Sequence, residues 1–118
     1  EIVQSDRPGE NILVFKRALG VTTGILPWNF PFFLIARKLA PALITGNTIV
    51  IKPSEETPIN CFEFARLVAE TDLPTGVFNV VSGTGAGVGH ALTSHAGIDL
   101  ISFTGSVATG SRMCTATW

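Results

Sequence analysis

Strand-like and helix-like segments alternate along most of this chain, and this alternation limits the folds that are open to it. Apolar runs rich in β-branched residues cover residues 20–26, 48–51, 77–81 and 100–103. Helix-like segments separate these runs, so the order of elements is βαβαβαβ. That order predicts the α/β class, with a parallel sheet and right-handed crossover connections.

The first two connections between these runs carry the clearest helix signals. Residues 32–43 have apolar residues at helical spacing, and Gly46 predicts the end of that helix. Thr57 and Pro58 predict the start of a second helix, with the threonine as N-cap and the proline in the first helical position. We expect this second helix to end near Asp72.

The composition fits a single domain whose sheet is buried on both faces. A length of 118 residues is typical of one domain. Hydrophobic residues make up 46% of the chain and charged residues only 14%, as in proteins with parallel sheets. The formal net charge of −1 argues against a nucleic-acid-binding surface, which requires a basic patch. We therefore expect no nucleic-acid partner.

Residues 30–44 form the most apolar stretch, but Arg37, Lys38 and Pro41 interrupt it. A membrane-spanning helix needs about 20 mostly apolar residues, so we expect no membrane association. The chain also does not open with a basic segment followed by an apolar core, and we therefore expect no secretory signal.

Cys61 and Cys114 form neither a CxxC motif nor any spacing typical of metal ligands. We therefore expect no metal site. We expect both residues to be reduced thiols in a cytoplasmic protein. Cys61 lies between apolar neighbours in the second predicted helix, which indicates a position in the core.

Three polar segments directly follow predicted strands, at residues 27–29, 52–55 and 104–106. Parallel sheets place their ligand sites at the carboxyl ends of the strands. The shared position of these three segments therefore predicts one binding site at a single edge of the sheet.

Asn29 and Ser106 each precede a predicted helix, where both residue types serve as N-caps. Asn29 has a second interpretation, because a carboxamide N–H is able to stabilise the oxygen that becomes negative when a nucleophile attacks a carbonyl. For Ser106, the hydroxyl and the first amides of the helix form an anion site suited to a pyrophosphate. This role is compatible with capping.

Lys52 and Glu55 flank Pro53 and Ser54 in the second polar segment. As an exposed pair in a loop, they would contribute little free energy. As a binding site, the carboxylate would accept hydrogen bonds from both hydroxyls of an adenine ribose and would repel a 2′-phosphate. Glu55 therefore favours NAD over NADP.

Glycines recur at alternate positions through residues 83–89, but they do not form the G-x-G-x-x-G fingerprint. From Gly83 the sixth position is Val88, and from the next glycine it is His90. Glu55 also precedes the glycines, whereas the acidic residue of that motif follows them. A conventional short-chain or medium-chain reductase is thus disfavoured. His90 fits either a half-exposed helix residue or a donor of one hydrogen bond to a cofactor.

Three motifs, in this order and spacing, resemble the aldehyde dehydrogenase family. They are L-P-W-N-F-P at residues 26–31, N-T-I-V-I-K-P-S-E at residues 47–55 and F-T-G-S at residues 103–106. The resemblance covers about residues 6–110 and is closest to the lactaldehyde and glycolaldehyde branch. It implies a parallel Rossmann-like sheet that is part of the cofactor-binding domain of the aldehyde dehydrogenase fold.

The resemblance implies an NAD-dependent enzyme that oxidises small aldehydes to carboxylic acids, with Asn29 as a catalytic oxyanion donor. Residues 1–19, with an extended segment at 12–15, would be a lead-in strand region. Residues 20–118 would be a partial NAD-binding domain. The residues implied to bind the cofactor are Leu26, Trp28, Lys52, Pro53, Ser54, Glu55, Gly85, Gly89, His90 and Ser106.

In the family, oxidation proceeds through a hemithioacetal on a cysteine in a G-Q-x-C context, with a glutamate base in an E-L-G-G-K context. Neither context occurs in this chain, and Cys61 and Cys114 have the wrong surroundings. The resemblance therefore implies an inactive fragment, without the catalytic Cys and Glu, of a cytoplasmic homo-oligomer (dimer or tetramer). The alternative is a non-catalytic nucleotide-binding module, which would have no use for an oxyanion donor at position 29.

Overall fold

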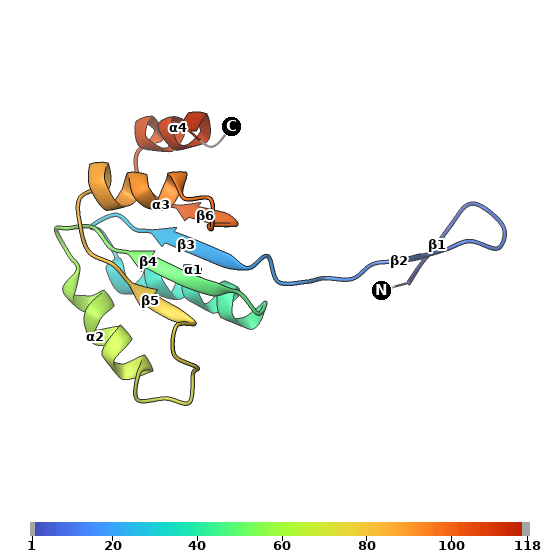
Figure 1. The fold of residues 1–118 in the computed structure, drawn as a ribbon, viewed down its shortest axis with the longest axis horizontal. Helices are drawn as coiled ribbons and strands as arrows, with labels where there is room; N and C mark the ends of the chain where they lie inside the picture. The colour runs from blue at the N-terminus through green and yellow to red at the C-terminus, as the bar shows by residue number, and fades with distance from the viewer. Residues whose placement is uncertain (1, 117–118) are drawn as a thin grey trace.

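A computed structural model describes residues 2–116 of the chain, which form two separate sheets and a set of helices (Figure 1). The strands are β1 (Ile2–Gln4), β2 (Asn11–Leu13), β3 (Val21–Ile25), β4 (Thr48–Lys52), β5 (Phe78–Val80) and β6 (Leu100–Phe103). The helical segments are α1 (Pro31–Ile44), α2 (Ile59–Val68), the π-helix η1 (Gly85–Gly89), α3 (His90–Ser94) and α4 (Val107–Ala116).

The larger sheet is parallel and has the strand order β5-β4-β3-β6. The chain runs outward from β3 through β4 to β5 and then returns past β3 to form β6 on its other side. Figure 1 shows α2 next to β5, and α3 and α4 at the β6 end of the sheet. This arrangement confirms the predicted α/β class. The change of direction between β3 and β6 leaves a crevice at their carboxyl ends, where open α/β sheets bind ligands.

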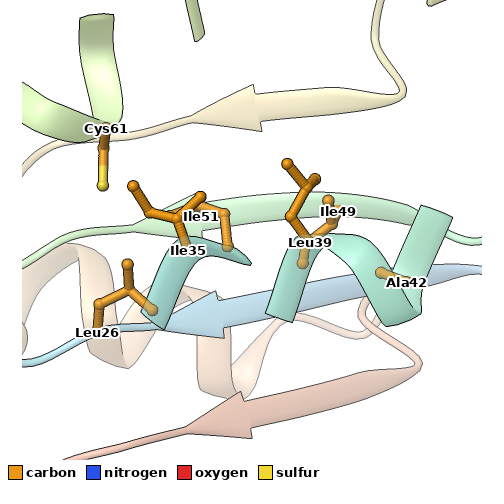
Figure 2. Packing of buried hydrophobic residues seen from close by; sticks show 7 residues of the cluster. All are labelled: Leu26, Ile35, Leu39, Ala42, Ile49, Ile51 and Cys61. Atoms are coloured by element: carbon orange, nitrogen blue, oxygen red, sulfur yellow. The ribbon is translucent and has the colours of Figure 1, made fainter. Parts of the chain in front are cut away.

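The core lies between α1 and the sheet (Figure 2). Ile35, Leu39 and Ala42 share one face of α1 because they follow one another at helical spacing. The whole cluster of buried residues is Leu26, Ile35, Leu39, Ala42, Ile49, Ile51 and Cys61. Cys61 is therefore a core residue, as predicted, and burial raises the pKa of its thiol to about 11.

Strands β1 and β2 form an antiparallel hairpin that stands apart from the larger sheet (Figure 1). Ile2 pairs with Leu13, and every residue of both strands is exposed. The prediction for residues 12–15 was correct only in part. The strand ends at Leu13, and its partner is β1, because the short loop between the two strands lets them pair locally.

Helix α1 continues past Pro41 to Ile44, and Gly46 follows it with a φ of 81°. This left-handed conformation suits glycine and confirms the predicted helix end. At 14 residues, α1 is the longest helix in the part of the chain that the structure describes. None of the helices within residues 2–116 combines the length and the apolar character needed to cross a bilayer.

Helix α2 differs from its predicted bounds at both ends. It begins at Ile59, preceded by Pro58, and no side chain caps it. Thr57 is not the N-cap, because its hydroxyl instead donates to the backbone carbonyl of Trp28 at 2.8 Å. The helix ends at Val68, and turns lead from there to Asp72.

Replacement of a core isoleucine should show how much the sheet depends on α1. Ile51 is 0% exposed, and we expect Ile51→Ala to lower the free energy of unfolding by about 2–5 kcal/mol, because the lost atoms leave a cavity beneath α1. Ile44 is 88% exposed, and the matched variant Ile44→Ala should change it by no more than about 0.5 kcal/mol. Urea denaturation followed by circular dichroism measures both values. Equal losses would contradict the packing described above.

Candidate cofactor-binding site

A cavity of about 190 Å³ lies at the carboxyl ends of β3, β4 and β6. Its walls also include the π-helix η1 and the first turn of α4. The predicted site residues that line it are Leu26, Lys52, Ser54, Glu55, Gly85, Gly89 and Ser106. The structure therefore brings together most of the residues that the sequence suggested, although they come from separate segments of the chain.

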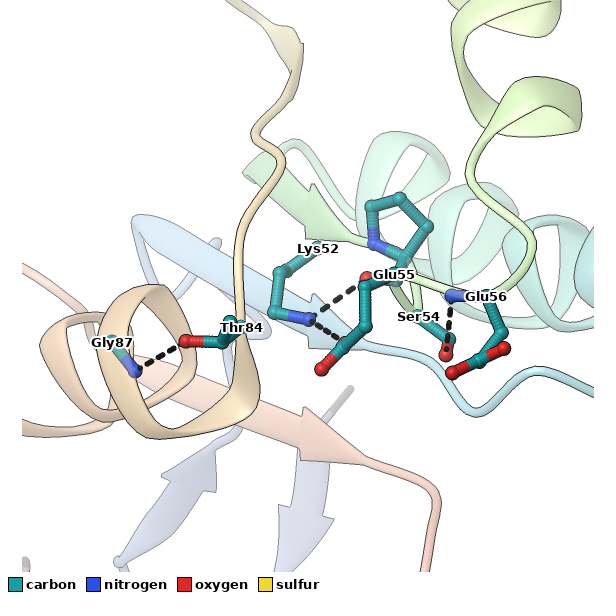
Figure 3. A network of polar contacts seen from close by, with 7 residues as sticks. Lys52, Ser54, Glu55, Glu56, Thr84 and Gly87 are labelled. Carbon is teal, nitrogen blue, oxygen red and sulfur yellow. Dashed lines mark hydrogen bonds and ion pairs between the residues drawn. The ribbon is translucent and has the colours of Figure 1, made fainter.

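The Lys52 ammonium group is the most buried charge in this site. The lysine side chain is only 3% exposed, and its Nζ donates to the Pro53 carbonyl at 2.9 Å and to the Glu55 carboxylate at 3.2 Å (Figure 3). A buried charge is costly unless it is paired and hydrogen-bonded. These two acceptors meet that requirement, so the last residue of β4 holds a fixed positive charge at the cavity. Pro53 itself is buried and contributes its carbonyl.

The Glu55 carboxylate is half-exposed and lies at the same cavity. Hydrogen bonds from its own backbone N–H, and then from Lys52, hold the pKa of this carboxyl below its usual range. The backbone N–H of Gly85 makes a smaller contribution in the same direction, because the glycine segment lines the same cavity as the carboxylate. Glu55 thus presents a charged hydrogen-bond acceptor to the cavity.

The β6–α4 turn forms another wall of the cavity. The Thr104 N–H donates to the Ile25 carbonyl at 3.1 Å and ties this turn to the end of β3. The Ser106 hydroxyl accepts a hydrogen bond from the Thr109 N–H at 3.2 Å, which confirms the predicted N-cap. The first turn of α4 therefore starts at the cavity, where its amides and helix dipole favour an anion.

The glycine segment forms a single turn of π-helix, which the sequence did not predict. The Thr84 hydroxyl caps it by accepting a hydrogen bond from the Gly87 N–H at 3.1 Å (Figure 3). A Cβ at Gly85 would meet nothing within 4 Å, so a ligand has room to approach the backbone there. π-Helical turns of this kind are frequent at functional sites.

His90 lies in a neighbouring cavity of about 400 Å³, between η1, α3 and α4. The two cavities share three lining residues, Gly85, Thr109 and Met113, and so adjoin. This neighbouring cavity is also lined by four residues for which no sequence motif suggested a role, namely Thr93, Thr109, Arg112 and Met113. Thr109 and Met113 follow Ser106 at helical spacing, and this shared helix face is the sequence signal that would have indicated both residues.

Trp28 and Asn29 are exposed and do not line either cavity. Phe30 precedes α1 in the left-handed conformation, with φ 50° and ψ 48°, and no side chain caps the helix. The N-cap interpretation of Asn29 is therefore wrong. Its carboxamide makes no hydrogen bond to any other residue in the described range 2–116, and it is available to a ligand. A left-handed residue other than glycine is also the kind of strain that occurs at functional sites.

Comparison with known proteins identifies the family to which these features belong. The family model described as the aldehyde dehydrogenase family matches residues 1–117. The chain belongs to the aldehyde dehydrogenase family. Lactaldehyde dehydrogenase of Escherichia coli (strain K12) is 68% identical over 113 residues, or 96% of this chain. The 3,6-anhydro-α-L-galactose dehydrogenase of Vibrio sp. (strain EJY3) is 45% identical over 98% of the chain.

Solved structures confirm that the fold is part of an aldehyde dehydrogenase. The crystal structure of E. coli lactaldehyde dehydrogenase has a TM-score of 0.94 and 65% identity over 99% of this chain. Betaine aldehyde dehydrogenase of Staphylococcus aureus, solved in complex with NAD+, has a TM-score of 0.93 and 38% identity over 99% of the chain. The chain spans 24% of the first of these structures and 23% of the second, and 24% of each of the two sequence relatives.

The Lys52–Glu55 pair should stabilise the fold over the whole neutral range of pH. Because the folded pKa of Glu55 lies below its ordinary value of 4.5, the stabilisation is present above that value and is lost as the pH falls through the lower, folded value. We expect the difference in melting temperature between the wild-type chain and Glu55→Gln to be constant from about pH 8 to about pH 5 and to vanish at more acidic pH. Thermal melts across this range measure the difference. Its loss already near pH 6 would contradict the pairing.

Proposed function

We propose that this chain forms the dinucleotide-binding part of an NAD-dependent aldehyde dehydrogenase that oxidises small aldehydes, of the lactaldehyde or glycolaldehyde type, to carboxylic acids. The observation that carries this proposal is the buried Lys52 ammonium paired with the half-exposed Glu55 carboxylate in one cavity with Ser106. Family membership and similarity to lactaldehyde dehydrogenase support the reaction class.

The chemistry of the cavity fits an adenine dinucleotide. Glu55 would accept hydrogen bonds from the ribose hydroxyls, and Lys52 would donate to one of them. The pyrophosphate would lie at the first turn of α4 beside Ser106, where helix amides favour an anion. The adenine base would enter the neighbouring cavity, which His90 and Met113 line. NAD, when bound, accepts a hydride from the carbon that is oxidised.

Asn29 would act on the aldehyde rather than on the nucleotide. Its carboxamide is exposed and precedes the left-handed Phe30, so the loop holds it clear of α1. An amide N–H aimed at the aldehyde oxygen would stabilise the negative charge that forms there when a thiolate attacks the carbonyl. Trp28, whose carbonyl is fixed by Thr57, would border the same region of the cofactor channel.

The nucleophile and the base would come from the rest of the enzyme. Cys61 is buried, and its raised pKa of about 11 keeps the thiol protonated at neutral pH. Cys114 is exposed on α4, and it does not line the cavity that Lys52 and Glu55 border. We therefore assign neither thiol to catalysis. The intact enzyme would be a cytoplasmic homo-oligomer.

Replacement of Glu55 tests the assignment of the ribose site. Isothermal titration of the 118-residue chain should give tighter binding of NAD than of NADP. Glu55→Gln should reduce this preference by about tenfold or more, because removing the carboxylate removes its repulsion of a 2′-phosphate. Glu56→Gln is the matched control, since this exposed neighbour does not line the cavity. An unchanged preference in Glu55→Gln would contradict the assignment.

A turnover assay tests the assignment of the missing nucleophile. With glycolaldehyde and NAD, the purified chain should produce no NADH, measured as absorbance at 340 nm, although it binds the nucleotide. Sustained turnover that disappears in Cys114→Ala or Cys61→Ala would show that the chain holds its own nucleophile. Absence of NAD binding would instead contradict the proposed function itself.

A further inference from the structure

Lys38 makes a link between α1 and β6 that the proposed function does not use. It lies on α1, is half-buried, and its Nζ donates to the Ser102 hydroxyl on β6 at 2.9 Å. Helix α1 otherwise packs against β3, β4 and α2. Among the described residues 2–116, this is the one hydrogen bond that joins α1 to β6.

Gly24 of β3 makes this link possible. It pairs with Ser102 in the parallel ladder between β3 and β6. A Cβ on Gly24 would lie 3.0 Å from the Lys38 Cδ and 2.5 Å from the Ile51 Cδ1. The lysine stem therefore crosses β3 at the residue that leaves space for it, and the ammonium group reaches the next strand. Burial, and then the neighbouring Arg37, lower the pKa of Lys38, because both disfavour its charged form. The Ser102 hydroxyl accepts a hydrogen bond from the ammonium group and so offsets part of this cost.

Little apolar packing supports β6 on this face. Two cavities, of about 290 and 340 Å³, lie beside Lys38 between α1 and β6. Arg37, Lys38 and Ser102 line both of them. β6 is also the last strand at its end of the described sheet, so only β3 pairs with it. The polar bond therefore replaces the side-chain packing that holds β3 and β4 to α1.

The position of the bond relates it to the candidate site. Ser102 lies two residues before Thr104, which starts the turn that carries Ser106. Movement of β6 relative to α1 and β3 would move this turn away from the wall formed by Lys52 and Glu55. The separation of these two walls decides whether one ligand contacts both.

We propose that Lys38 and Ser102 are positioning residues that fix the turn at residues 104–106 against β3, and so set the pyrophosphate site relative to the ribose site. The proposal rests on the proposed function. It concerns ligands that span both sites, because a ligand confined to the ribose side does not depend on the separation of the walls.

Isothermal titration of the 118-residue chain with adenosine and with ADP-ribose tests this role. ADP-ribose carries the pyrophosphate that adenosine lacks. Ser102→Ala should raise the Kd of ADP-ribose by about tenfold or more, the effect of losing one hydrogen bond to a charged group, and leave that of adenosine within about twofold. Ser102→Thr, which keeps a hydroxyl, should restore ADP-ribose binding. Lys38→Met should reproduce Ser102→Ala from the other side of the bond.

Ser5→Ala is the matched control, because it removes a serine hydrogen bond to Glu10 in the distant hairpin. It should change neither affinity. A purely structural role would lower the melting temperature of Ser102→Ala and weaken both ligands equally, and this result would overturn the proposal. Unchanged ADP-ribose binding in both Ser102→Ala and Lys38→Met would overturn it too. If the wild-type chain bound neither ligand, the proposed function would fail together with this inference.

Discussion

Strand β3 pairs in parallel with β4 on one side and with β6 on the other, and the candidate site depends on this double pairing. Just beyond the ladders, the Leu26 N–H donates to the Lys52 carbonyl at 3.0 Å, and the Thr104 N–H donates to the Ile25 carbonyl at 3.1 Å. These bonds extend the strand register into the loops that follow. Polar groups that are far apart in the sequence therefore meet at one edge of the sheet.

A buried cation gives this edge its chemical character. Moving an ammonium group out of water is costly, and Lys52 offsets the cost with one carbonyl and one carboxylate. The carbonyl comes from the buried Pro53, whereas the carboxylate belongs to the half-exposed Glu55. The carbonyl and the carboxylate thus provide the hydrogen bonds that the buried ammonium group needs. The exposed side of the same carboxylate presents hydrogen-bond acceptors to a ligand.

Local chemistry explains which features the sequence predicted. The four strands of the parallel sheet lie within one residue of their predicted ends, because β-branched residues have a high propensity for strands. Ser106 caps α4 as expected from its neighbours alone.

Tertiary contacts explain the features that the sequence did not predict. Thr57 bonds to a carbonyl in a loop 29 residues earlier, and Met113 reaches the cavity only because α4 packs beside α3. No local pattern encodes the Thr57 contact or the π-helical turn at Gly85–Gly89, and helical spacing indicates only which face of α4 Met113 occupies.

The β1–β2 hairpin has a different thermodynamic character from the sheet to which it is attached. Neither of its strands buries a side chain, and two-stranded hairpins are at best marginally stable by themselves. The segment that joins the hairpin to β3, in contrast, is anchored at its end, since the Asn47 carboxamide oxygen accepts from the Leu19 and Gly20 N–H groups at 2.6 and 3.0 Å. The cooperative unit of unfolding therefore ends near Leu19. The hairpin is able to fray and re-form while the candidate site at the edge of the larger sheet stays intact.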